Sequence, residues 1–132
     1  MANPEETAEI REYIQRLIEA TRSGEMNWSP ANPTTYSWDA PVVNNQSARL
    51  TLQRVEQAEP PTVSGGRLVQ KKSTSHVLQA FEIRGANAIS RVTIRGLDNP
   101  ELDKQMESLY ELIEYEKKRV ALDFLKSVIP KK

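Results

Sequence analysis

The chain has 132 residues, a formal net charge of zero and 38% hydrophobic residues, which fits one domain with a buried core. The absence of cysteine excludes disulfides, thiolate metal sites and cysteine nucleophiles, and the single histidine, His76, cannot begin a zinc site by itself. No stretch approaches the roughly 18–20 apolar residues of a membrane span and the first residues carry no secretory signal, so we expect a cytoplasmic protein with no membrane partner.

The charge is unevenly distributed along the chain. Residues 1–44 carry three arginines against seven acidic residues, and residues 45–96 carry eight basic residues against three glutamates. Residues 97–132 are nearly balanced, with seven basic and eight acidic residues. The basic middle segment is therefore the strongest charge asymmetry of the sequence.

A first helix is predicted over about residues 4–22. Asn3 suits the N-cap, Pro4 suits the first helical position and Gly24 suits a left-handed stop. Between them, apolar residues recur with the helical period and form one stripe: Ile10, Tyr13, Ile14, Leu17 and Ile18.

Strands are predicted over about 35–43 and 48–55, because polar and apolar residues alternate there. Asn44-Asn45-Gln46-Ser47 between them has turn chemistry. Residues 56–74 contain Pro60-Pro61 and Gly65-Gly66 and are expected to form a long loop, either mobile or functional, with a short strand at Arg67–Gln70 as an option within it.

A hairpin is predicted from two further strands, 76–84 and 89–95, around Gly85-Ala86-Asn87-Ala88. The register that gathers apolar residues on one face also makes an opposite-charge pair across the strands. It sets Arg84 opposite Ile89, Phe81 opposite Val92 and Glu82 opposite Arg91.

The last helix is predicted over about 99–129, with Asp98 or Asn99 as its cap and Pro130 as its stop. It carries two apolar stripes. The main stripe holds Leu102, Met106, Leu109, Ile113, Val120, Phe124 and Val128, and the second holds Leu112, Tyr115, Leu125 and Ile129. Two stripes indicate either a break near 115–119 or a second packing surface.

These elements define an α+β fold, in which a four-stranded antiparallel β-meander packs against an N-terminal and a C-terminal helix. One face of the sheet is expected under both helices and the other is expected to be partly free.

Two surfaces are candidates for binding. The second stripe of the last helix, if the sheet leaves it uncovered, favours a protein partner or a homodimer, with Leu112, Tyr115 and Leu125 as contact residues. The basic residues of the sheet and loop favour a polyanion such as nucleic acid, the less favoured partner. They are Arg49, Arg67, Lys71, Lys72, Arg84, Arg91 and Arg95.

No catalytic, metal or cofactor site emerges from the remaining residues. His76 is expected to be an exposed or half-buried strand residue, because its neighbours Ser73 and Ser75 do not supply a nucleophile and an orienting carboxylate. Asp39 has no second carboxylate to work with. Ser64-Gly65-Gly66 does not match a phosphate loop.

Both ends of the chain resemble small prokaryotic domains of unknown function. Residues 17–28 fit their Leu-x-x-Ala-Thr-x-x-Gly-x-x-x-Trp pattern, and Leu109-Tyr110-Glu111-Leu112 is similar to the signature of their final helix. The resemblance implies a fold and a bacterial accessory or interaction module, without catalytic residues. We therefore expect a non-enzymatic interaction or accessory module that contacts a protein partner or a second copy of itself through its last helix, with polyanion binding as the alternative.

Overall fold

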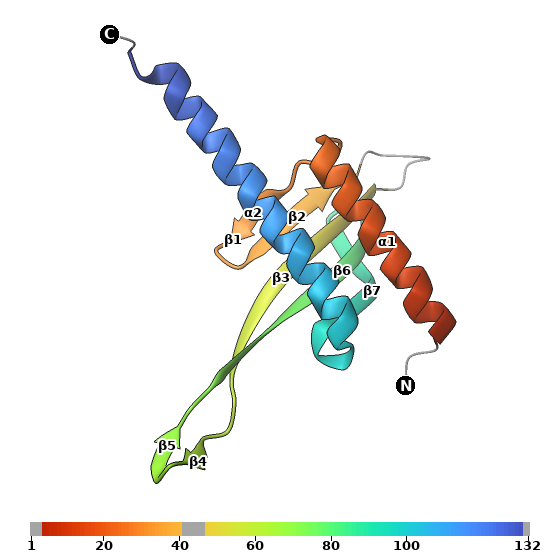
Figure 1. Ribbon diagram of the computed structural model, residues 1–132. Coiled ribbons are helices and arrows are strands. Elements are labelled where there is room, and N and C mark those ends of the chain that lie inside the picture. The colour runs from red at the N-terminus through yellow and green to blue at the C-terminus, as the bar shows by residue number, and fades with distance from the viewer. Residues whose placement is uncertain (1–3, 41–46, 131–132) are drawn as a thin grey trace.

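The computed structural model describes residues 4–40 and 47–130 and confirms the α+β class. A helix at each end of the chain flanks an antiparallel sheet of five strands, and two short strands form a second, small sheet (Figure 1). The elements are α1 (Pro4–Ser23), β1 (Ser29–Asn32), β2 (Thr35–Asp39), β3 (Ser47–Ala58), β4 (Thr62–Ser64), β5 (Arg67–Val69), β6 (Lys72–Arg84), β7 (Asn87–Arg95), the 3-10 helix η1 (Gly96–Asp98) and α2 (Pro100–Val128).

Helix α1 has the bounds that its periodicity predicts. It buries Ile14 and Ile18, and it ends at Ser23, before Gly24, whose φ of 86° lies in the left-handed region that favours glycine. The buried Thr21 hydroxyl accepts a hydrogen bond of 2.9 Å from the Trp28 indole, which fixes the chain where it turns from α1 toward the sheet. The predicted cap, Asn3, lies outside the described residues.

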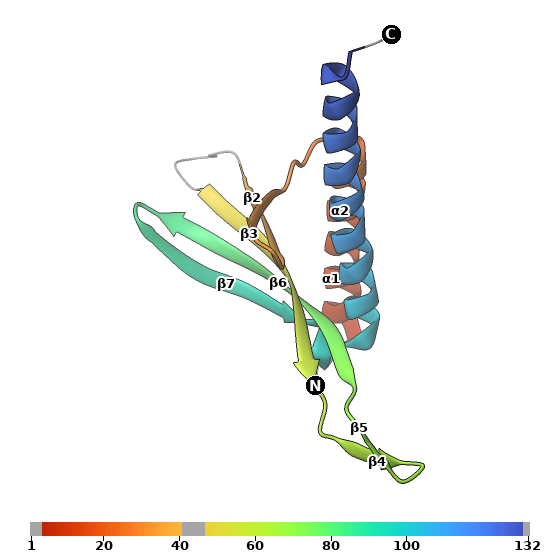
Figure 2. The ribbon, with the colours of Figure 1, turned by 90° about the vertical axis from the view of Figure 1, so that its left-hand side faces the viewer.

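The large sheet has the strand order β1-β2-β3-β6-β7, one strand more than the meander we expected. The added strand is β1, which pairs with β2 at the edge of the sheet, where Pro30 is tolerated, and its register shifts between Pro30 and Asn32. Both helices lie on the same side of the sheet, as predicted (Figure 2). Residues 41–43, which the alternation assigned to a strand, and Asn44-Asn45-Gln46 of the expected turn lie outside the described residues.

Residues 56–74 do not form the long loop that we expected. Strands β3 and β6 pair without interruption as far as Ala58 and Lys72, and together they make a ribbon that projects from the sheet (Figure 1). The hairpin β4–β5 continues it, and Gly65 and Gly66 turn there with φ of 59° and 77°. Two successive positive φ angles suit a two-residue hairpin turn, so the glycines build a strand connection here.

The register of the β6–β7 hairpin differs from the predicted one. Its turn is shorter, so that Arg84 pairs with Asn87 rather than with Ile89, and the register shifts again between Ala80 and Phe81. Arg91 is the extra residue of β7 at this bulge, so the alternation of β7 side chains between the two faces of the sheet reverses there. Val92 therefore lies opposite Ala80, on the side of the sheet that faces the helices. Phe81 lies opposite Ser90 rather than Val92.

Helix α2 begins at the cap Asn99, whose side chain accepts hydrogen bonds from the backbone N–H groups of Glu101 and Leu102. It runs without the break that one alternative placed near 115–119. Helix α1 holds it through an ion pair between Arg11 and Glu101. The core gathers between α1, α2 and the sheet and contains Ile14, Ile18, Met26, Trp28, Leu52, Leu78, Leu102, Met106, Leu109, Tyr110 and Ile113.

Candidate functional site

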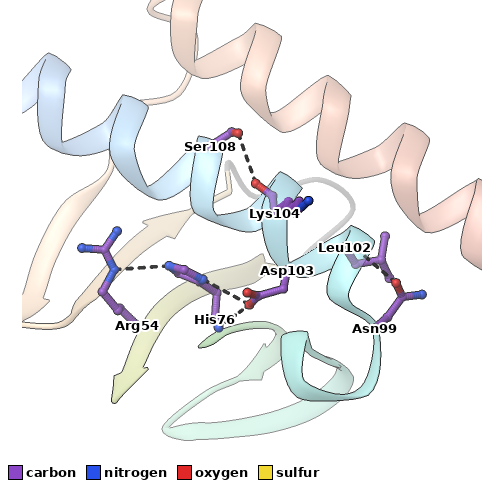
Figure 3. Close-up of polar contacts among 7 residues, drawn as sticks. All are labelled: Arg54, His76, Asn99, Leu102, Asp103, Lys104 and Ser108. Carbon is purple, nitrogen blue, oxygen red and sulfur yellow. Dashed lines mark hydrogen bonds and ion pairs between the residues drawn. The ribbon is translucent and has the colours of Figure 1, made fainter. Parts of the chain in front are cut away.

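His76 is the most buried polar side chain of the described residues, at 1% exposure, rather than the exposed or half-buried residue that we expected. Its backbone N–H and its Nδ1 lie 2.8 Å and 3.2 Å from Oδ1 of Asp103, in the first turn of α2. From the neighbouring strand, Nε of Arg54 donates to Nε2 of His76 at 3.2 Å (Figure 3). Because Nε2 accepts, the ring proton belongs on Nδ1, where it points at the carboxylate.

Gly96 makes room for this arrangement. A Cβ atom at that position would lie 1.9 Å from Oδ1 of Asp103, far inside van der Waals contact. Only a residue without a side chain therefore lets Asp103 reach the backbone and ring of His76.

Two tyrosines complete the cluster beside Arg54. The guanidinium carbon of Arg54 lies 4.2 Å from the centroid of the Tyr110 ring, and the Tyr36 ring centroid lies 5.2 Å from the same ring. Burial raises the pKa of both tyrosines, and the nearby Glu114 carboxylate raises it further. Arg54 Nη1 also approaches Glu114 Oε1 at 3.6 Å.

The hydrogen bonds of this cluster suit a structural role, because they connect β3 and β6 with α2. A general base needs a free ring nitrogen that a substrate can reach. Here both ring nitrogens of His76 are engaged and the side chain is enclosed between β3, β6 and α2. Within residues 4–40 and 47–130, no three His, Asp or Glu side chains come together as a set of metal ligands.

The second half of α2 is different, because nearly all of its side chains are exposed. Every residue from 117 to 130 is exposed, and the helix projects beyond both α1 and the sheet (Figures 1 and 2). We call residues 117–129 the α2 tail. Six large apolar side chains of this tail are each more than half exposed: Val120, Leu122, Phe124, Leu125, Val128 and Ile129.

The three residues of α2 that were predicted to contact a protein partner differ in how far they are exposed. Leu112 is half-buried against the core, whereas Tyr115 and Leu125 are 62% and 51% exposed. Val120, Phe124 and Val128 were assigned to the core stripe and are exposed, because the body of the domain ends one turn after Ile113. Both stripes therefore run into an exposed helix end, and a second packing surface there stays a prediction.

The seven predicted polyanion contacts do not gather on one surface. Arg49 donates to Asp39 at 2.7 Å, which raises the pKa of the guanidinium. Arg84 and Arg91 both donate to Glu82 and lower the pKa of that carboxyl. The others lie elsewhere: Arg95 at the end of β7, and Arg67, Lys71 and Lys72 along the projecting ribbon. Polyanion binding stays a prediction, with three of its seven cations held by carboxylates.

Comparison with known proteins finds no match: no family model, no curated protein and no solved structure is significantly similar to this chain. Neither helix in the described part of the chain is long and apolar enough to cross a bilayer.

Proposed function

We propose that the protein is a non-enzymatic interaction module that associates with further copies of itself through the α2 tail. One observation carries the proposal: a helix that projects from the domain places six large apolar side chains in solvent within ten residues. Exposed apolar patches of more than a few hundred Å² are rare on monomeric proteins and mark interaction sites.

The tail continues the stripe that forms the core. Val120 lies seven residues, or two turns, beyond Ile113, which is 1% exposed, and Phe124 and Val128 follow at intervals of four. The same helix face is therefore buried in the body and solvated in the tail. A sequence under no demand to cover this face would be expected to become polar where the body ends.

The energetics favour a complex in which two tails are covered. Completing the burial of six half-exposed side chains contributes about 1 kcal/mol each, or about 6 kcal/mol for one tail. Association itself costs about 4–15 kcal/mol. One buried tail therefore offsets only the low end of this cost, whereas a symmetrical complex that buries two tails gains about 12 kcal/mol, which exceeds most of the range.

The charges of α2 favour a like chain as the partner. Residues 100–116 carry six acidic side chains and one lysine, whereas the tail begins with three consecutive basic residues, Lys117, Lys118 and Arg119. A tail that meets the acidic part of α2 or the glutamate-rich α1 of another copy gains charge complementarity, which raises the association rate and suppresses other alignments.

Light scattering on the purified chain across a concentration series tests the proposal. We expect a mass above that of the monomer, and we expect Phe124→Asp to return the chain to the monomer. The matched control is Lys126→Gln, which makes the same change of one charge unit on the opposite, polar side of the helix, roughly 200° from Phe124. A wild-type chain that stays monomeric at high concentration contradicts the proposal, and so does loss of association in the control alone.

A further inference from the structure

A groove lies between α1 and strands β3, β6 and β7. In this region the sheet turns away from the helices (Figure 2). The groove is a hollow of about 470 Å³, and its walls are largely apolar. We call it the α1–β7 groove. Ile10, Tyr13 and Leu17 line it from α1, and Leu78, Val92 and Ile94 line it from β6 and β7.

This groove is open in the single chain. Val92 is 47% exposed and Tyr13 is 53% exposed, although both face apolar neighbours along the groove. An apolar occupant would complete the burial that the core leaves unfinished on this side of the sheet.

The rim of the groove is acidic. Glu6 and Glu9 lie along it, and neither forms an ion pair with any residue of the described chain. The one arginine on the rim, Arg16, is held by Glu12 at 2.8 Å. The occupant that suits this rim is therefore apolar in the middle and basic at its flank.

The α2 tail has that pattern. Val120, Phe124 and Val128 form its apolar stripe, and Lys117 lies on the same side, two turns before Phe124. Lys118 adds a second cation at the start of the tail. A straight helix cannot bring this tail to the groove of its own chain, because α2 leaves the body beside the last turn of α1, where Val120 lines a hollow with Thr21 and Gly24. Glu6 and Glu9 lie near the first turn of α1, at its other end.

We propose that the α1–β7 groove receives the α2 tail of a second copy of this chain. The inference rests on the proposed function and deepens it by naming the surface that the tail meets. Each chain then contributes one tail and one groove, so that two copies can exchange tails reciprocally and bury both.

Disulfide trapping tests the pairing on the full chain, which has no cysteine of its own. One preparation carries Phe124→Cys, the other carries Val92→Cys together with an affinity tag that makes the three possible dimers differ in mass. Because a disulfide forms only when the two Cα atoms come within about 7 Å, mild oxidation of the mixture reports direct contact. Lys126→Cys mixed with the same Val92→Cys chain measures chance collisions from the same tail.

We expect a mixed dimer between Phe124→Cys and Val92→Cys. Each of these variants oxidised alone should give no more dimer than the collision background, and the Lys126→Cys mixture should also give no more than that background. Dimers of Phe124→Cys with itself would place tail against tail, which overturns the inference and leaves the proposed function intact. If light scattering shows that the two cysteine variants still associate and oxidation traps no mixed dimer between them, the inference is also overturned and the groove is left to a small apolar ligand. A chain that is monomeric by light scattering removes both proposals.

Discussion

Gly96→Ala tests the polar cluster, because the added methyl group must displace the Asp103 carboxylate. The Cβ would lie 1.9 Å from Oδ1, and that oxygen is held by two hydrogen bonds from His76. The backbone of Gly96 belongs to η1 and its φ is outside the left-handed region, so the substitution itself causes no dihedral strain.

The expected cost follows from what the carboxylate leaves behind. Displacing it strands two buried donors on His76, at about 1–3 kcal/mol each. Replacing glycine by alanine also raises the free energy of unfolding by about 0.4–1 kcal/mol, because it restricts the conformations of the unfolded chain. We therefore expect Gly96→Ala to lower the free energy of unfolding by about 1–5 kcal/mol, and Asp103→Ala by about 2–6 kcal/mol, because it strands the same donors without the gain from replacing a glycine.

The double variant separates this mechanism from a general packing defect. Once Asp103 is alanine, the remaining conflict is the 2.8 Å approach of the two Cβ atoms, which a small shift relieves. Gly96→Ala should then cost about 1 kcal/mol or less, because alanine's effect on the unfolded chain offsets part of that shift. The four chains are compared by urea denaturation followed by tryptophan fluorescence. Costs that add to within about 0.5 kcal/mol would refute the reasoning.

Two further predictions concern titratable groups. Hydrogen bonds from Arg91 and Arg84 lower the pKa of Glu82, so the stability they contribute is present above its ordinary value of 4.5 and is lost as the pH falls through the lowered pKa. Glu82→Gln should therefore lower the melting temperature at neutral pH, with a difference that closes in acid; a difference unchanged by pH would count against the ion pairs. Since burial and then Glu114 raise the pKa of Tyr110, ultraviolet difference titration should show a late phenol that Tyr110→Phe removes. Glu114→Gln should advance that step only in part, and full normalisation would show that burial is not the main cause.

Local signals in the sequence predict α1 well. Pro4 at the first helical position and Gly24 after the last turn act within a few residues, and the apolar stripe between them needs no knowledge of the rest of the chain. The β6–β7 register depends on a single extra residue, Arg91, which alternation cannot reveal because it looks like any other strand residue. The predicted contact of Arg91 with Glu82 is nevertheless present, at 2.8 Å, since the side chain reaches across the bulge.

The candidate site shows where sequence reasoning ends. The environment of His76 comes from Asp103, 27 residues later, and from the gap at Gly96, and no pattern within the strand signals either contact. Helical periodicity places Phe124 on the core stripe correctly, but it contains no information on where the sheet beneath that stripe stops. Burial of the tail residues therefore depends on the length of the helix relative to the body, which only the three-dimensional structure gives.

Hydrogen–deuterium exchange of the α2 tail at low and high protein concentration tests the central claim most directly. A projecting helical end of about a dozen residues is marginal in water, so its amides should exchange rapidly in the dilute monomer. When another copy covers the tail, residues 117–129 should become protected as the concentration rises, while the amides where β3 pairs with β6 do not change. Exchange in the tail that is rapid at every concentration would contradict self-association through α2.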